Sequence, residues 1–296
     1  MLHLASINLN GAPRLAFKDD DRFRLLPGDM TTMQDAIVAG SPALFELSNR
    51  GDLESMAFDP ALLVSPRTGS RRDILCAGWN YWDHFEEGRG RRDGQDVDRP
   101  EHPTFFTKGP DTMIDPFGEI AYDPEISAKW DYEVELALII GKDGRSISED
   151  SALDHVFGYC LANDISQRDL QRAHGGQWLK GKSIDGTMPF GPYVTLAVDV
   201  DPGAIDLECI VNGETVQSAS TKLMAFSVSQ LIAELSFGMT LRAGDILLTG
   251  TPAGVGNART PQLFLTEGDE VICRSPQLGE FRNRLTAVDL HSTFVA

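Results

Sequence analysis

Two glutamates stand two residues apart inside an apolar segment, "KWDYEVELALII" (residues 129–140). Side chains two positions apart in a β-strand share a face, so we expect Glu133 and Glu135 to lie side by side, with Cβ atoms roughly 7 Å apart. Asp164 follows a second apolar segment, "GYCLAN" (158–163). Buried like charges repel or retain protons, and a bound cation removes both penalties. The three carboxylates therefore indicate a cation site.

The donor atoms restrict the ion. Carboxylate oxygens suit a hard divalent ion such as Mg²⁺, Mn²⁺ or Ca²⁺, and not Zn²⁺. The chain has no EF-hand motif. An exposed strand face with ordinary acidic side chains would give the same pattern, so this alternative stays open at the sequence level.

A histidine with acidic neighbours lies upstream, in "NYWDHFEE" (80–87). One helical turn would bring His84 and Glu87 together. Asp83 and Glu86 flank the same histidine, so the spacing does not select its partner, and a surface helix with a chance His–Glu neighbour gives the same pattern. If the pair lines a site, the histidine can act as a general base.

The segment "TGTPAGVG" (249–256) is rich in glycine and threonine. It lacks the ending of a P-loop and the G-x-G-x-x-G pattern of dinucleotide sites. Its backbone N–H groups are suited to face an anion, although a simple turn after a strand fits equally well.

These residues need elements that position them. A hairpin of residues 2–9 and 13–20 through Asn10-Gly11 and a helix over 31–40 that ends near Gly40 predict a small α+β unit. The polar connector 65–73 marks the boundary. Beyond it we expect short strands at 74–81, 131–141, 157–166, 191–198, 207–217, 245–252 and 269–275, and helices at 148–157 and 227–238. Residues 88–103 predict a long exposed loop.

Composition limits the partners. The 296 residues carry 26 basic and 44 acidic side chains, a net charge of −18, which repels nucleic acid and anionic lipid. Four scattered cysteines without a CxxC pair fit a reduced compartment. The N-terminus does not have the pattern of a signal peptide, and no run approaches the roughly 20 apolar residues of a spanning helix. We expect a cytoplasmic protein.

Five segments occur in an order that resembles the fumarylacetoacetate hydrolase superfamily: "AGWNYWDHFEE", "DYEVELALIIGK", "GYCLANDISQRDLQ", "QWLKGKSIDGTMPFGP" and "GDILLTGTPAGVG". The resemblance covers roughly residues 72–286. It implies an α+β, β-rich fold: a mixed β-roll or sandwich catalytic domain (71–296) behind a small N-terminal α+β domain (1–70). It also implies a Mg²⁺ or Mn²⁺ site, usually a homodimer, and chemistry on small 2-oxo acids or β-diketones.

The resemblance assigns roles to residues. It implies Glu133, Glu135 and Asp164 as the metal ligands, with a fourth ligand near residues 80–83 left open. It implies a dyad in which Glu87 orients His84, and Lys182 as an active-site cation that holds a carboxylate or an oxyanion. It implies that four further residues bind the substrate: Arg168, Gln171, Gly250 and Thr251. Taken singly, Arg168 and Gln171 are explained equally well as solvated side chains after a strand. The alternative for Lys182 is a solvated strand lysine, although Lys180 on the same face fits that alternative better.

Our preferred hypothesis is that the protein hydrolyses a C–C bond in an acylpyruvate-like or other β-diketone acid. The reaction would be metal-dependent and would pass through a metal-stabilised enolate. His84 with Glu87 would activate the water. The runner-up is an oxaloacetate-type decarboxylase. An isomerase or dehydratase of a 2-oxo sugar acid or an aromatic-degradation intermediate is the third option. A non-catalytic protein that binds a divalent ion would need the carboxylates but not the dyad.

Overall fold

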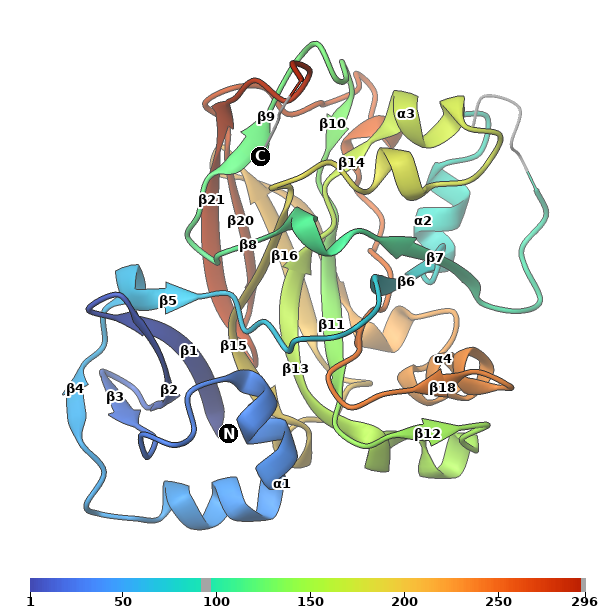
Figure 1. Cartoon of the computed structure of the whole chain (residues 1–296). Helices are drawn as coiled ribbons and strands as arrows, with labels where there is room; N and C mark the ends of the chain where they lie inside the picture. Colours follow the sequence, from blue (N-terminus) through green and yellow to red (C-terminus); the bar gives the residue numbers. More distant parts are fainter. Residues whose placement is uncertain (92–96, 294–296) are drawn as a thin grey trace.

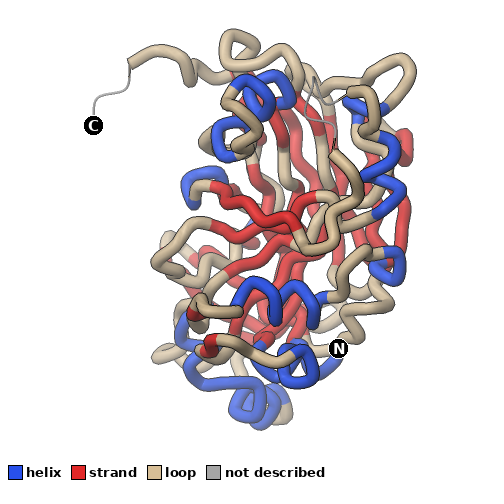
Figure 2. Tube along the Cα trace, turned by 90° about the vertical axis from the view of Figure 1, so that its right-hand side faces the viewer, coloured by secondary structure: helices blue, strands red, loops and turns tan. Residues whose placement is uncertain are grey.

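The computed structural model describes residues 1–91 and 97–293. A large mixed sheet runs through the molecule, and a smaller sheet packs beside it (Figures 1 and 2). The large sheet has the order β4 (Ser55–Ala57), β3 (Arg22–Leu25), β2 (Ala12–Lys18), β1 (His3–Leu9), β15 (Met188–Leu196), β13 (Val156–Asn163), β11 (Val134–Ile140), β19 (Ile246–Leu248), β6 (Ile74–Gly78) and β7 (Thr104–Lys108), with β5 (Leu63–Val64) beside β1 and β8 (Met113–Ile114) beside β15.

The second sheet has five strands: β17 (Glu214–Ser220), β16 (Asp206–Val211), β20 (Glu270–Ser275), β21 (Gly279–Ala287) and β9 (Ile120–Tyr122). Two short pairs complete the strands: β10 (Trp130–Asp131) with β14 (Ser166–Gln167), and β12 (Gly144–Arg145) with β18 (Thr240–Leu241). The α-helices are α1 (Met33–Ser48), α2 (Trp82–Glu87), α3 (Arg168–Ala173) and α4 (Val228–Ser236). The fold is thus α+β and β-rich, as predicted.

The central strands are buried on both faces. Leu136 and Leu138 of β11 contact the core that includes the second sheet and α4. Ala137 and Ile139, on the opposite face, contact the core that includes β1, β2 and α1. This alternation follows the period of two expected for a strand.

The N-terminal residues extend the same sheet. His3 of β1 lies opposite Thr195 of β15, and the imidazole Nδ1 is 2.9 Å from the Thr195 hydroxyl. Figure 1 shows this unit in blue beside the central strands. The division at residue 70 stays a prediction, since the sheet runs across it.

One predicted helix differs from the structure, and another is followed by a second helical segment. The helix expected to end near Gly40 does break there, since Gly40 has a non-helical backbone with φ of 79°. A second helical segment that contains Pro42 follows directly and runs to Ser48, so α1 spans a kink. Residues 148–157 form a 3₁₀ helix, Glu149–His155, and not an α-helix. It ends there because Val156 already pairs with Ile140 in the large sheet.

The hairpin predicted at Asn10-Gly11 is confirmed, and the structure has a second hairpin at an Asn-Gly step within residues 207–217. Asn10 and Gly11 link β1 to β2, and Asn212 and Gly213 link β16 to β17, all four with positive φ. The helix predicted at 227–238 is α4, capped by Ser227. None of the described helices is long and apolar enough to cross a membrane.

The predicted loop 88–103 is described only at its ends, and residues 92–96 lie outside the described residues. Arg91 donates to the backbone oxygens of Asn257 and Arg259. Arg99 donates to Glu86, and its guanidinium lies 5.0 Å from the Trp82 ring centroid.

Candidate active site

The three predicted carboxylates meet where β11 begins and the antiparallel strand β13 ends. Val134 lies opposite Asn163, and the Asp164 N–H donates to the Glu133 carbonyl at 2.8 Å. One oxygen from each of Glu133, Glu135 and Asp164 lies within 4.8 Å of the other two. Because these side chains are at most 4% exposed, the alternative of an exposed acidic strand face is wrong.

Buried cations surround two of the carboxylates. Lys182 Nζ lies 2.6 Å from Glu133 Oε2 and 2.7 Å from Asp164 Oδ2. Arg168 Nη2 lies 2.6 Å from Glu133 Oε1. Burial opposes ionisation of Glu133, but Lys182 and Arg168 outweigh it and hold the pKa of this carboxyl well below its usual value. The pKa of Lys182 is raised despite burial, so this residue carries its charge.

Glu135 has no cationic partner among the described residues. Its Oε2 accepts the N–H of Gly250 at 2.7 Å. Burial, and then the charges of Asp164 and Glu133, raise the pKa of Glu135 well above its usual value. A divalent ion between the three carboxylates would compensate their negative charge. Their all-oxygen donor set fits Mg²⁺ or Mn²⁺, and Ca²⁺ is also compatible.

Of the acidic residues near His84, Glu87 is the one that contacts the imidazole. His84 Nδ1 lies 2.8 Å from Glu87 Oε1, and Glu87 Oε2 accepts the N–H of Gly254 at 2.8 Å. Glu86 instead pairs with arginines of the following loop, and Asp83 is exposed. With Nδ1 engaged, His84 has Nε2 left for proton exchange.

The predicted substrate residues are already bonded to protein groups. Arg168 and Gln171 lie one turn apart on α3, and the guanidinium donates to the amide oxygen at 3.1 Å. Gly250 gives its N–H to Glu135. The Thr251 hydroxyl donates to the Val134 carbonyl. Their roles in substrate binding stay predictions.

One cavity of about 40 Å³ joins most of these groups. It is lined by His84, Glu133, Glu135, Arg168, Gln171, Lys182 and Thr251, together with aromatic residues. A larger cavity of about 1010 Å³, lined mainly by the connector residues 69–73 and by Arg242, Ala243 and Asp245, contains none of the predicted site residues. The small cavity is therefore the candidate active site.

Asn80, in the segment where a fourth metal ligand was left open (residues 80–83), has another role. The Asn80 amide donates to the backbone oxygens of Phe226 and Thr249 and accepts the Phe226 N–H, so it connects loops. Within residues 1–91 and 97–293, the carboxylate set at this site therefore consists of Glu133, Glu135 and Asp164.

Two buried charged residues near the site were not given a role in the sequence analysis. Lys108, at the end of β7, places Nζ 2.9 Å from Asp164 Oδ1. Asp131 accepts from Arg168 Nε at 2.8 Å and from the N–H groups of Gly256 and Asn257. Asp131 shared the predicted strand face with the glutamates, which was a usable signal, whereas Lys108 had none beyond its place at the end of an aromatic segment.

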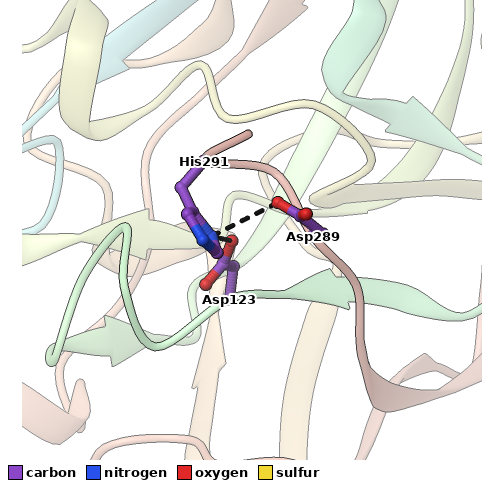
Figure 3. A group of neighbouring side chains, drawn as sticks. All are labelled: Asp123, Asp289 and His291. Atoms are coloured by element: carbon purple, nitrogen blue, oxygen red, sulfur yellow. Dashed lines mark hydrogen bonds and ion pairs between the residues drawn. The ribbon is translucent and has the colours of Figure 1, made fainter. Parts of the chain in front are cut away.

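A second group of metal-ligand types lies at the C-terminal end (Figure 3). His291 Nδ1 is 2.9 Å from Asp123 Oδ2 and 3.3 Å from Asp289 Oδ1. Asp123 also accepts the backbone N–H groups of Glu125 and Leu290. These contacts fasten the C-terminal segment to the loop after β9.

A buried carboxylate cluster beside a His–Glu pair on a β-rich fold is a candidate enzyme site. Residues 73–286 match the family described as "Fumarylacetoacetate (FAA) hydrolase C-terminal". The chain belongs to this enzyme family.

Several characterised relatives carry the name oxaloacetate tautomerase. The Bacillus subtilis protein YisK is 41% identical over 256 residues, which cover 85% of this chain and 83% of that one. The human mitochondrial protein FAHD2A is 42% identical over 214 residues, covering 72% of this chain and 66% of that one.

Solved structures agree on the fold. A fumarylacetoacetate hydrolase from Exiguobacterium antarcticum superposes with a TM-score of 0.83 at 34% identity, covering 97% of this chain and 100% of that one. A 2-hydroxyhepta-2,4-diene-1,7-dioate isomerase from Mycobacterium marinum gives 0.74 at 27% identity, covering 97% and 99%.

Proposed function

We propose that this protein is a metal-dependent tautomerase of a small 2-oxo acid, with oxaloacetate as the first substrate to test. The observation that carries the proposal is that His84 lines the same cavity as Glu133 and Glu135 of the carboxylate cluster. The names of the relatives at 41–42% identity support isomerisation over the C–C hydrolysis preferred from the sequence.

The residues present fit the reaction. Tautomerisation moves one proton between C3 and the C2 oxygen, with no water consumed and no C–C bond broken. When bound, a divalent ion would polarise the C2 oxygen and make the C3 proton more acidic. His84 Nε2 accepts or returns the C3 proton, while Glu87 keeps Nδ1 protonated and the ring oriented.

The cationic side chains of the cavity could also interact with the negative charge of the substrate. Lys182 is charged and buried against Glu133 and Asp164. It therefore lies where it can offset negative charge that develops on the substrate oxygen, and a low-dielectric setting strengthens this effect. Arg168 borders the same cavity and is suited to a substrate carboxylate.

C–C hydrolysis is the second candidate, because the same oriented imidazole can deprotonate a water molecule. Decarboxylation needs neither the water nor this proton transfer. The homodimer, the cytoplasmic location and the identity of the ion stay predictions from the sequence.

The test is to follow enol-oxaloacetate by its ultraviolet absorbance with Mg²⁺- or Mn²⁺-loaded protein, subtracting the rate with metal alone. We expect faster approach to the keto form, without release of pyruvate. Pyruvate release from oxaloacetate would favour the decarboxylase, and cleavage of an acylpyruvate without tautomerisation would favour the hydrolase.

A further inference from the structure

Two tryptophans border the site at its outer end. Trp79 follows β6, and Trp178 precedes the 3₁₀ turn Leu179–Gly181. Both line the cavity of the carboxylates, and both line an adjoining cavity of about 50 Å³ that also contacts Val255 and Asn257. A ligand that extends from the carboxylates into this adjoining cavity therefore contacts the two indoles, beside His84, Arg168 and Gln171, which also line both cavities.

Packing holds these indoles in place. Their ring centroids are 4.8 Å apart, with the planes at 76°, an edge-to-face arrangement. Phe106 supports Trp178 at 5.2 Å, and Phe85 supports Trp79 at 5.7 Å. A Cβ atom at Gly78 would lie 2.3 Å from Trp178 Cζ3, so this indole rests directly on a glycine backbone.

The backbone of Trp79 is unusual. Its φ of 56° lies in the left-handed region, which bulky L-residues rarely adopt. Such outliers cluster at active sites and ligand clamps. Here the disfavoured conformation occurs at one of the two tryptophans that line both cavities.

We propose that Trp79 and Trp178 form an aromatic wall that limits the substrate to a short, unbranched 2-oxo acid of about four carbons. The inference rests on the proposed function, in that the substrate is a 2-oxo acid. The carboxylate cluster, Arg168 and Lys182 receive its 2-oxo acid end, so the remote end meets the indoles. The two cavities, of about 40 and 50 Å³, are far smaller than the about 300–1,000 Å³ of sites for drug-sized ligands.

The test compares pyruvate with phenylpyruvate, which share the 2-oxo acid group and differ by one phenyl ring. Their Kd values are measured by calorimetry on Mn²⁺-loaded wild type, Trp178→Ala and Trp79→Gly. Glycine accepts the left-handed backbone, so Trp79→Gly opens the wall without strain. Trp82→Ala is the matched control, because Trp82 packs against Phe85 and Phe226 and lines neither cavity.

We expect wild type to bind phenylpyruvate at least about tenfold more weakly than pyruvate, and both wall variants to shift this ratio toward phenylpyruvate by about tenfold or more. Trp82→Ala should keep the wild-type ratio. Equal binding of the two acids by wild type, or an unchanged ratio in the folded wall variants, would overturn the wall.

The ratio is measured without turnover, which separates the two proposals. A shifted ratio in a protein that does not tautomerise oxaloacetate would contradict the proposed function and support the wall. Tautomerisation with an unshifted ratio would contradict the wall alone. If neither acid binds to wild type, the wall proposal fails, and the proposed function is decided by the oxaloacetate assay alone. Trp79→Gly provides the result if Trp178→Ala does not fold.

Discussion

Glu87 lies 2.8 Å from His84 Nδ1 through one carboxylate oxygen, and its other oxygen accepts the N–H of Gly254. Gly254 belongs to the loop in which Gly250 donates its N–H to Glu135. The 249–256 loop thus fixes the orienting member of the dyad and one member of the carboxylate cluster together. Any change in this loop should move both parts of the site.

The charge of Glu87 should matter more than that of its neighbour. Glu87→Gln keeps the size of the side chain but removes the carboxylate that contacts His84 Nδ1 and orients the ring. We expect kcat to fall at least about tenfold, with metal affinity unchanged. Glu86→Gln is the control, since Glu86 contacts Arg89 and Arg99 outside the cavity. Equal kcat values for the two variants would show that Glu87 does not orient the histidine.

Glu135→Gln should separate metal binding from stability. An amide is a poorer ligand for a hard cation, so we expect Mn²⁺ affinity to fall by more than the about 10–100-fold typical of outer-shell partners. The raised pKa of Glu135 means that stability present below its ordinary value of 4.5 is lost as pH rises. The metal-free variant should therefore have a higher Tm than metal-free wild type near pH 7. An unchanged Mn²⁺ affinity by calorimetry would remove Glu135 from the ligand set.

Chelation should abolish tautomerase activity, because the all-oxygen cluster selects a hard divalent ion. Mg²⁺ or Mn²⁺ should restore it, whereas Zn²⁺ should restore less. The measurement is the rate of enol loss after exhaustive chelation, with metal content checked by elemental analysis. Full activity in metal-free protein would contradict the assignment of the cluster.

The contact of His291 with Asp123 should make stability depend on pH. The hydrogen bond to Asp123 raises the pKa of His291 above 6.5, so its stabilisation is complete below pH 6.5 and is lost as pH rises through the folded-state value. The Tm difference between wild type and His291→Gln should be larger at about pH 5.5 than at about pH 9. His155→Gln serves as a control, since the hydrogen bond that the His155 ring makes within the described residues is to a backbone oxygen, that of Lys142, and not to a carboxylate. A difference that does not vary with pH would show that this contact is not ionic.

Much of the site and of the strand pattern could be predicted from the sequence, because strand periodicity and Asn-Gly turns depend on residues that are close together in the chain. Glu135 lies in β11 and Glu133 directly precedes it, so the alternation expected for this segment predicts the pair, and Asp164 directly follows β13. The sequence did not reveal that both faces of β11 are buried, since a period of two fits a half-exposed strand equally well.

Other features depend on contacts between distant segments. Nothing near Lys108 in the sequence indicates that it meets Asp164, and nothing near Gly254 indicates that it holds Glu87. β21 is different: its Phe281, Asn283 and Leu285 are buried between exposed arginines, an alternation that was present in the sequence and could have predicted this strand.

His84→Ala tests the central claim most directly. The variant and wild type are brought to the same Mn²⁺ occupancy, verified by calorimetry, and the rate of enol-oxaloacetate ketonisation is measured for both. We predict unchanged metal affinity and a rate lower by about 10²–10⁴-fold, the usual contribution of a general acid–base group. Ketonisation by His84→Ala at the wild-type rate would show that this histidine does not carry the proton.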